Sequence, residues 1–440
     1  MDEDDFLERT VMMHDFYGGK FTTSFKVPLD KENLQEYSSI WYTPGVAEPC
    51  RKIKKDERKV YDYTNKGNMV AVVSDGTRVL GLGDIGPKAS YPVMEGKSLF
   101  FKYLGGVDAV PLPIAEQDEE KIVELVEKIE PGFGGINLED IEKPKCFRVL
   151  DKLKEKLEIP VWHDDQQGTA LVSLAGLFSA LKLVDKNISE IKLVIGGAGA
   201  AGINNAKYAI KGGADPSNVR IVDSKGILSP DREDVKGTYK EKWAKKTNPQ
   251  GERGNMKEAL KGADACISAT VPGPGTIKKE EVENMAEDAI LFAEANPTPE
   301  ISPEKAKEAG IRIIGTGRSD YSNQINNSIG FPGVFRGVLE VKATDITDKM
   351  CIAAAKAISE RTEEIGLQDD FIIPGMDDKE TYVKEAVAVG MQAIKEGVAR
   401  KEYTRSELRG KVEEKINEPK KLMKTLRKNN LIKDSSIKDE

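Results

Sequence analysis

The feature that most constrains the fold of this chain is a glycine-rich turn between an apolar strand and a helix. The stretch IKLVIGGAGAAGINNAKYAIKGG at 191–213 carries the pattern G-x-G-x-x-G. Glycines at this spacing permit a tight turn and let a pyrophosphate approach the N-terminus of the helix. The predicted turn consists of Gly197, Ala198, Gly199, Ala200, Ala201 and Gly202. This pattern predicts a dinucleotide site, although a plain strand–helix turn would use the same glycines.

An acid at the end of the next strand supports the dinucleotide interpretation. Asp223 ends the predicted strand in NVRIVDSKG, about 20 residues after the turn, where an acid binds the hydroxyls of adenosine ribose. An acid at this place favours NAD, because it repels the additional phosphate of NADP. Lys225 follows two residues later and is able to bind that phosphate. The choice between NAD and NADP therefore stays open.

Strands and helices alternate through the middle of the chain. Later apolar strands are predicted in ADACISAT at 263–270, AILFAEANP at 289–297 and IRIIGTG at 311–317. Repeated alternation of this kind predicts a doubly wound parallel sheet of the Rossmann type. We therefore expect an α/β protein with a Rossmann dinucleotide-binding domain at 165–345.

The segments on either side of this domain have different patterns. Residues 1–164 mix helices with short strands, such as GNMVAVVSDG at 67–76, and predict a mixed α/β domain for substrate and metal. Residues 346–440 carry apolar stripes at helical period and predict a C-terminal helical segment that packs on the core. The charged residues near the C-terminus are expected on a solvated helix and tail.

Charge and composition exclude several classes of protein. The 440 residues carry a net charge of −8, which argues against sequence-independent binding of nucleic acid, because such binding needs a basic face. The four cysteines form no C-x-x-C pair and fit a reducing compartment, so a cytoplasmic location is expected. The acidic N-terminus has no signal-peptide pattern, and no apolar run is long enough to predict a membrane span.

Two acidic pairs occur where predicted strands end. Glu139 and Asp140 end the strand in INLEDI, and Asp164 and Asp165 end the strand in PVWHDD. Acids at strand ends face the usual site edge of an α/β protein, and oxygen ligands suit Mg²⁺ or Mn²⁺. Either pair alone would equally fit a solvated turn or a helix cap. His163 is left out of the ligand set, because its side chain should point away from that of Asp164.

Other polar residues occur in stretches that suggest a site. Lys97 lies in an apolar stretch, where loss of water would lower its pKa toward use as a base, although a surface lysine would fit as well. Tyr42 precedes Pro-Gly in IWYTPGVAEP, and Arg78 lies in DGTRVLGLG. Asn296 and Asn327 supply uncharged amides that bind a carboxylate or a ribose, or serve as ordinary turn residues.

Taken together, these stretches resemble malic enzyme in the short form found in prokaryotes. The resemblance runs from about residue 38 to 345 in family order. The matching segments are WYTPGVAEP, SDGTRVLGLGDIGPKASYPVMEGK, INLEDI, HDDQQGTA, GAGAAG, VDSKG, ANP and NQINNSIGFPGVFRG. Several of these segments are long and specific, whereas the residues after 345 are less diagnostic.

The resemblance implies roles for individual residues. It implies Tyr42 as the catalytic acid and Lys97 as the catalytic base. Arg78 would contact a substrate carboxylate. The implied metal ligands are Glu139, Asp140 and Asp165, supported by Asp164. Asn296 and Asn327 would contact both the substrate and the cofactor.

The implied reaction converts L-malate and NAD(P)⁺ into pyruvate, CO₂ and NAD(P)H by way of oxaloacetate. The resemblance also implies a homodimer or higher homo-oligomer with the N-terminal helices at the interface. Three alternatives stay open: malolactic decarboxylation with retained NAD, a metal-independent amino-acid dehydrogenase, and a non-catalytic protein that senses a dinucleotide. Net formation of NAD(P)H would distinguish malate oxidation from the malolactic reaction. Turnover without metal would favour an amino-acid dehydrogenase.

Overall fold

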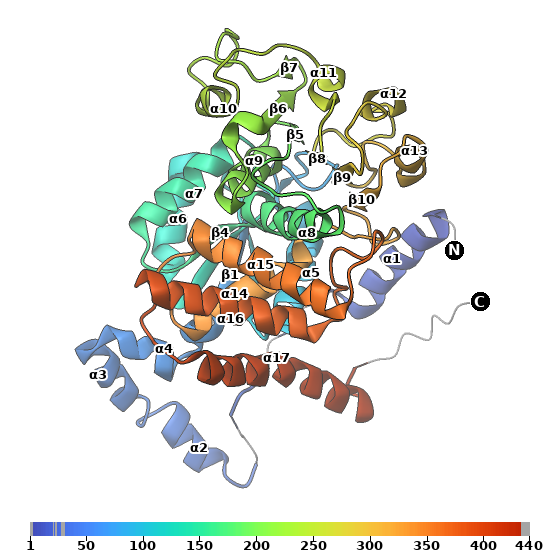
Figure 1. Ribbon diagram of the computed structural model, residues 1–440. Coiled ribbons are helices and arrows are strands. Elements are labelled where there is room, and N and C mark those ends of the chain that lie inside the picture. The colour runs from blue at the N-terminus through green and yellow to red at the C-terminus, as the bar shows by residue number, and fades with distance from the viewer. Residues whose placement is uncertain (1–2, 21, 23, 28–30, 433–440) are drawn as a thin grey trace.

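The computed structural model describes residues 3–20, 22, 24–27 and 31–432 of the chain. Two sheets, the first parallel and the second parallel except for one short edge strand, follow one another along the chain, and helices cover them (Figure 1). The predicted α/β class is therefore confirmed.

The first sheet has the strand order β2-β1-β3-β4, and all its strands are parallel. Its strands are β1 (Met69–Ser74), β2 (Asp108–Pro113), β3 (Gly135–Leu138) and β4 (Val161–His163). The connecting helices are α5 (Gly86–Gly105), α6 (Glu119–Ile129) and α7 (Lys145–Lys156). Because the strands are parallel, β3 and β4 end at the same edge, and each is followed by one of the predicted acidic pairs.

The second sheet has the order β10-β9-β8-β5-β6-β7. Its strands are β5 (Leu193–Gly196), β6 (Val219–Asp223), β7 (Gly226–Ile227), β8 (Ala265–Ser268), β9 (Ile290–Ala293) and β10 (Ile313–Thr316). All pairs are parallel except that of β6 with the two-residue β7. The strand order reverses between β5 and β8, which is the place where doubly wound sheets bind dinucleotides.

Short helices connect the strands of this sheet. They are α9 (Ala200–Gly212), α10 (Tyr239–Thr247), α11 (Met256–Leu260), α12 (Lys279–Val282) and α13 (Pro303–Glu308). Capping is visible at α11, where Asn255 accepts from Lys257 N and Glu258 accepts from Asn255 N.

One almost fully buried helix joins the two sheets. Helix α8 (Thr169–Leu183) follows β4 after a short π-helical turn, Asp164–Gly168, and packs against α9 and α15. Its burial on nearly every side explains why it reads as continuously apolar rather than as an amphipathic stripe.

The C-terminal residues are helical, as predicted. The helices are α14 (Phe331–Glu340), α15 (Asp348–Ile365), α16 (Lys379–Glu396) and α17 (Arg405–Lys428). Helices α14 and α17 pack against α5 of the first part of the chain, whereas α15 packs against α8 and α9 (Figure 1). These helices therefore hold the two sheets together from one side.

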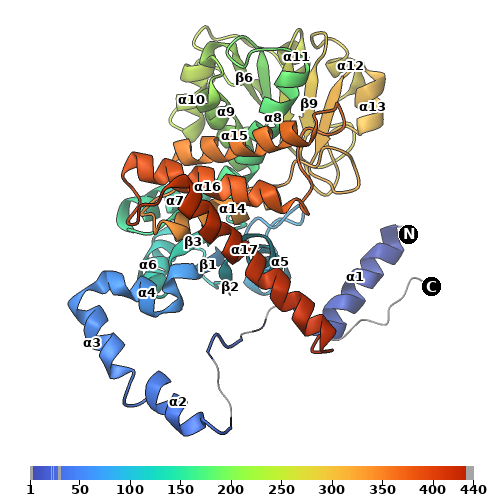
Figure 2. The ribbon, with the colours of Figure 1, turned by 60° about the horizontal axis from the view of Figure 1, so that its bottom comes forward.

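Three N-terminal helices lie largely outside the packed body. They are α1 (Glu3–Tyr17), α2 (Leu34–Trp41) and α3 (Ala47–Lys55). The short α4 (Val60–Tyr63) returns to the body, where Asp62 pairs with Lys342. Helices α2 and α3 contain no buried residue, and both views show them projecting away from the two sheets (Figure 2). We call residues 31–55 the N-terminal arm.

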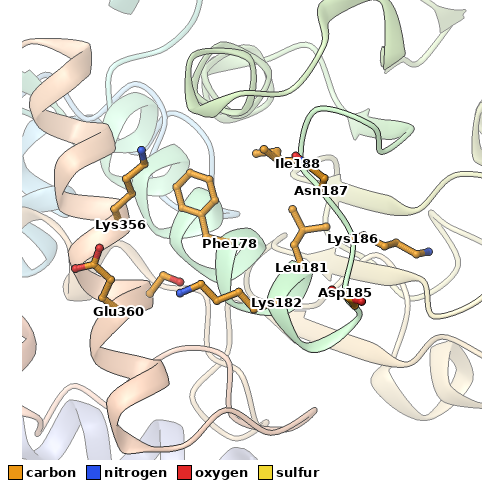
Figure 3. A pocket seen from close by; sticks show the side chains of 10 residues that line it. Phe178, Leu181, Lys182, Asp185, Lys186, Asn187, Ile188, Lys356 and Glu360 are labelled. Carbon is orange, nitrogen blue, oxygen red and sulfur yellow. The ribbon is translucent and has the colours of Figure 1, made fainter.

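A surface hollow of about 450 Å³ lies between α8 and α15 (Figure 3). Phe178, Leu181 and Ile188 supply its apolar lining. Two of its lysines are engaged in ion pairs, Lys182 with Glu363 and Lys186 with Asp264. None of the residues that line it is a predicted site residue, so the hollow is separate from the site described below.

Among the residues that the structure describes, no helix is both long enough and apolar enough to cross a bilayer.

Candidate active site

Three carboxylates from two strand ends converge in space. Ligand oxygens of Glu139, Asp140 and Asp165 all lie within 4.8 Å of one another. Glu139 and Asp140 directly follow β3, and Asp165 lies in the π-helical turn after β4. The backbone N–H of Asp140 donates to Oδ2 of Asp165 at 3.0 Å, which ties the two segments together.

This cluster has the chemistry of a site for a hard divalent cation. Oδ2 of Asp140 is buried and has no hydrogen-bond partner within the described part of the chain. Burial, together with repulsion from Asp165, raises the pKa of Asp140 to about 8. A buried, unsatisfied carboxylate among others costs free energy unless a cation neutralises it. The donor set therefore fits Mg²⁺ or Mn²⁺.

Lys97 lies beside this cluster and contacts two carboxylates. Its Nζ is 2.5 Å from Oδ2 of Asp164 and 3.0 Å from Oε1 of Glu139. The ammonium group also lies 4.5 Å from the ring centre of Phe331, which covers it from the side of α14. Only 9% of the Lys97 side chain is exposed, so this lysine points into the protein.

The expected lowering of the Lys97 pKa is not observed. Burial alone would lower the pKa of Lys97, but attraction to the carboxylates of Asp164 and Glu139 outweighs burial and raises it. The sequence interpretation considered only the apolar neighbours of Lys97 along its own helix. The carboxylates come from β3 and β4, far away in the chain.

Asp164 is held in place from three sides. One oxygen accepts from the indole N–H of Trp162 at 2.9 Å, and the other accepts from Lys97. A methyl group at Gly168 would overlap Oδ1 of Asp164 and would come within 3.3 Å of Cβ of Asn327. The two adjacent acids therefore differ, since Asp164 is fully buried whereas 39% of the Asp165 side chain is exposed.

The loop after β1 brings Arg78 to the same place. The backbone N–H of Arg78 donates to the carbonyl of Asp140 at 3.0 Å. The Arg78 guanidinium donates to the carbonyl of Leu80, a non-glycine residue with φ 47°. A methyl group at Gly81 in this loop would lie 3.1 Å from the carbonyl of Asn296, so the loop reaches the second sheet.

The glycine turn after β5 has the predicted geometry. Gly197 has φ 95°, which favours glycine. A methyl group at Gly202 would overlap the carbonyl of Gly197, so the close turn requires the third glycine as well. Lys143 reaches toward this turn, with its Nζ 3.5 Å from the position of a methyl group at Gly199. A pyrophosphate at the start of α9 would thus meet a nearby cation.

Asp223 lies at the end of β6, but its carboxylate is already engaged. It accepts from Arg232 at 2.9 Å and 3.1 Å and from Lys240 at 2.5 Å, and 8% of its side chain is exposed. Burial would raise the pKa of Asp223, but these hydrogen bonds lower it. Binding of adenosine ribose by Asp223 therefore stays a prediction that requires exchange of partners. Lys225 is exposed and lies 3.3 Å from Asp234.

Comparisons with known proteins decide the family. The domain described as "Malic enzyme, N-terminal domain" matches residues 18–120 and 115–154, and "Malic enzyme, NAD binding domain" matches residues 166–394. The chain belongs to the malic enzyme family.

Relatives and a solved structure agree with this assignment. The bifunctional malic/malolactic enzyme of Bacillus subtilis is 48% identical over 89% of this chain and 94% of its own length. The NAD-dependent malic enzyme of Geobacillus stearothermophilus is 48% identical over 90% of this chain and 80% of its own length. The crystal structure of malic enzyme from Pyrococcus horikoshii OT3 has a TM-score of 0.92 and 50% identity, covering 96% of this chain and 99% of that one.

Tyr42, one of the predicted site residues, lies away from the others within this chain. Tyr42 lies between α2 and α3 on the N-terminal arm and is 70% exposed. Lys97 lies on α5 inside the body, and the two views show the arm well apart from this helix (Figure 2). Asn327 lies against the acidic turn at Gly168, and Asn296 lies against the loop that carries Arg78.

His163 is fully buried and lies next to the cluster of three carboxylates. Its Nδ1 is 3.7 Å from Oδ2 of Asp165. Burial lowers the pKa of His163, although the neighbouring acids oppose this effect. The imidazole is therefore neutral, and because this is also the form that binds metals, the exclusion of His163 from the ligand set stays a prediction.

The sequence did not predict several residues that support the site. Asn137 donates to Oε2 of Glu139 at 2.8 Å, and Trp162 donates to Asp164. Both precede an acid by two residues in their strands, so side-chain alternation would have placed each of them on the same face as its acid. Glu300 accepts from Thr270 N and Ala295 N, which joins the loops after β8 and β9.

Proposed function

We propose that this chain converts L-malate to pyruvate and CO₂ and transfers a hydride to NAD or NADP. The observation that carries the proposal is the placement of Lys97 between Asp164 and Glu139, next to the cluster of three carboxylates. The strand ends of a dinucleotide-binding sheet lie opposite this cluster. Membership of the malic enzyme family supports the reaction.

Lys97 is the group proposed to move the proton of the C2 hydroxyl. Asp164 and Glu139 hold Nζ at fixed distances of 2.5 Å and 3.0 Å, so the acceptor position is fixed before the substrate binds. Because these carboxylates raise the pKa of Lys97, the side chain is an ammonium as long as their charge is not offset. A cation held by Glu139, Asp140 and Asp165 would offset that charge, and Lys97 would then give up its own proton and be able to take that of the C2 hydroxyl. Phe331 keeps water from the other side of Nζ.

Glu139, Asp140 and Asp165 would hold a Mg²⁺ or Mn²⁺ ion. When bound, such a cation supplies polarisation of the substrate oxygens and positive charge that offsets the three carboxylates. Arg78 is proposed to neutralise a substrate carboxylate, which its exposed side chain permits. Asn296 and Asn327 would add uncharged hydrogen bonds to substrate and cofactor.

We propose that the active form is a homodimer or a higher homo-oligomer. The N-terminal arm exposes Ile40, Trp41 and Tyr42, each at 49% or more, and helix α5 exposes Leu99 and Tyr103. Clustered exposed apolar side chains of this size are typical of interfaces. Since Tyr42 lies far from Lys97 in its own chain, we propose that the arm delivers Tyr42 to the site of a second copy, where it protonates C3.

The division at 164 and 345 and a cytoplasmic location also belong to this proposal. The first sheet ends at His163, which supports the first boundary. Helix α14 lies before residue 345 yet packs on α5, so the C-terminal cover begins earlier than the predicted boundary. All four cysteines are free, which suits a reducing compartment.

Malolactic decarboxylation is the second candidate. The 48% identical Bacillus subtilis relative is described as a bifunctional malic/malolactic enzyme. The same cluster would suit both reactions, because they share the decarboxylation of a C2-oxidised malate. They differ in whether the reduced cofactor leaves or returns its hydride to pyruvate.

An absorbance assay at the reduced-nicotinamide band tests the proposal. Malate with NAD or NADP and Mn²⁺ should give net reduced cofactor and pyruvate, and a chelator should abolish both. Lactate without net reduced cofactor would establish the malolactic reaction instead. Turnover that persists in chelator would contradict the role of the three carboxylates.

A further inference from the structure

A second buried acid lies at the edge of the dinucleotide-binding sheet, outside the residues used above. Glu294 directly follows β9, two residues before Asn296, and is 7% exposed. Its Oε1 is 2.5 Å from Oγ of Ser173 on α8. Its Oε2 accepts from the amide of Asn205 on α9 at 3.2 Å. One carboxyl group therefore joins a strand end to two helices.

The hydrogen bonds around Ser173 leave room for a proton on the carboxyl group of Glu294. Oγ of Ser173 also lies 2.8 Å from the carbonyl of Thr169, an acceptor. A serine hydroxyl has one proton, and a carbonyl has none. When that proton points to Thr169, the contact between Ser173 and Glu294 requires a proton on Glu294. The geometry thus fits a neutral carboxylic acid that donates to Ser173, which in turn donates to Thr169.

This chain of hydrogen bonds reaches the acidic turn of the active site. Thr169 is the first residue of α8, and its backbone N–H donates to the carbonyl of Asp164. The contact between Glu294 and Ser173 therefore joins the two sides of the cleft, because Ser173, Thr169 and Asp164 belong to one continuous segment. Through Asn205, the same carboxyl also holds α9, which begins in the dinucleotide turn.

We propose that Glu294 is a positioning residue whose protonated carboxyl group aligns the Asn296 segment and the start of α9 with the acidic turn at Asp164. This role rests on the malate reaction proposed above. Loss of the proton requires the Ser173 hydroxyl to turn toward Glu294. The contact between Glu294 and Ser173 is then kept, but the carboxylate is a buried charge that no cation faces. Burying an unpaired charge costs free energy, which favours a shift of the Asn296 segment away from α8.

The surroundings of Glu294 indicate that its carboxyl group loses the proton at mildly alkaline pH. Burial is the main reason that the pKa of Glu294 is raised, to about 8, and repulsion from Glu300 adds to it. The hydrogen bonds from Ser173 and Asn205 oppose this rise. The buried thiol of Cys266 on β8 also faces this group, and its own pKa is raised by burial, so it stays neutral. These groups supply no cation that would hold Glu294 ionised.

The substitutions Glu294→Gln and Glu294→Leu distinguish positioning by a protonated carboxyl group from a role of Glu294 in packing alone. The glutamine keeps a donor toward Ser173 and an acceptor toward Asn205 but does not titrate, whereas leucine removes both. The first readout is kcat/KM for malate against pH. The second is binding of NADH, measured by fluorescence against pH without malate or metal. The third is the infrared band of a protonated buried carboxylic acid in the full-length protein.

We expect the wild type to lose about tenfold in kcat/KM one pH unit above the pKa of Glu294, relative to the glutamine variant, since about one carboxyl group in ten then keeps its proton. Glu294→Gln should match the wild type at neutral pH and lack this loss, together with the infrared band. Glu294→Leu should have a reduced kcat at every pH. Asp151→Asn, at an exposed acid on α7 whose pKa is also raised, should leave the profile unchanged.

Superimposable pH profiles of wild type and Glu294→Gln would overturn the proposal, as would a wild-type kcat in Glu294→Leu. The NADH and infrared measurements do not depend on malate turnover. A wild type that binds NADH less tightly at alkaline pH, beside a glutamine variant that does not, would support the role of Glu294 even if malate proved not to be the substrate. Equal pH dependence of NADH binding in both proteins would contradict it.

Discussion

Single side chains in this protein acquire their chemistry from partners far away in the sequence. Lys97 is the clearest case, because a buried ammonium alone would lose its proton easily, whereas the carboxylates of Asp164 and Glu139 hold it charged. The same two contacts fix the position of its Nζ beside the three carboxylates. Replacement of Lys97 should therefore change the rate of malate oxidation without changing the affinity for the dinucleotide.

Lys97→Ala is expected to lower kcat for malate oxidation by between about 10² and 10⁴-fold, the range typical of a lost general base. Affinity for NADH, measured by fluorescence titration, should stay unchanged, because the glycine turn lies on the other sheet. Lys102→Ala is the matched control on the same helix, where Lys102 pairs with Asp108 at 2.7 Å. Retained malate oxidation in Lys97→Ala would show that another group is the base.

Glu385 is a buried acid whose carboxylate has no hydrogen-bond partner among the described residues. Both of its carboxylate oxygens are buried and make no hydrogen bond to the described residues, and burial raises its pKa well above the ordinary value of 4.5. It fits against α14 only because Gly333 has no side chain, since a methyl group there would overlap the carboxylate. Between the ordinary and the raised pKa, the folded state binds more protons than the unfolded state.

The free energy of unfolding should therefore fall as pH rises above about 4.5, with a contribution from Glu385 of up to about 1.4 kcal/mol per pH unit. Glu385→Gln should remove this part of the slope and be more stable than the wild type at neutral pH. Urea unfolding between about pH 5 and pH 8 measures both slopes. Glu360→Gln on the exposed side of α15 is the control. Equal slopes for wild type and Glu385→Gln would mean that Glu385 ionises without cost.

At the scale of elements, the π-helical turn at Asp164–Gly168 decides how β4 becomes α8. The turn presents Asp165 to Glu139 and Asp140 and keeps Asp164 against Lys97. π-Helical turns often occur at functional sites. Gly168 has ordinary right-handed helical dihedrals, so its need for glycine comes from the close approach of Asp164 and not from backbone strain.

Gly168→Ala should consequently displace the Asp164 carboxylate and lower kcat for malate by on the order of 100-fold, because small shifts of a catalytic group are costly. Circular dichroism should show an unchanged fold. Gly410→Ala on α17, where a methyl group meets nothing within 4 Å, should leave kcat unchanged. A fully active Gly168→Ala enzyme would show that the acidic turn has room to adapt.

At the scale of the whole molecule, the N-terminal arm is the part that a single chain leaves without a packing partner. Tyr42 is 70% exposed on this arm, while Lys97 is buried in the body. If two copies exchange arms, each active site combines Lys97 of one chain with Tyr42 of the other. The arrangement predicts that two inactive variants restore activity when mixed.

Tyr42→Phe and Lys97→Ala should each be nearly inactive in pyruvate formation alone. After unfolding and refolding of an equal mixture, about half of the dimers should be mixed and half of their sites complete, so about a quarter of the wild-type activity should return. Size-exclusion chromatography with light scattering should show a dimer or a larger assembly. An inactive mixture that nevertheless forms mixed dimers would place both residues in the same chain.

The sequence by itself determined the local elements and the class of fold. Apolar runs between turns predicted strands at the places of β1, β3, β4, β5, β6, β8, β9 and β10, because these strands are mostly buried. The glycine turn could be predicted from the sequence because its requirements are local. The φ of 95° at Gly197 and the close packing of Gly202 against Gly197 both require glycine. The resemblance to malic enzyme was equally a property of short contiguous segments.

The tertiary structure alone decided how these residues act on one another. It raised the pKa of Lys97, engaged Asp223 with Arg232 and Lys240, and separated Tyr42 from the other site residues. It also showed the buried carboxyl of Glu294 between two helices. Electrostatic attraction and burial depend on distances between segments that are remote in the chain. Local sequence patterns do not contain those distances, and only the packed molecule supplies them.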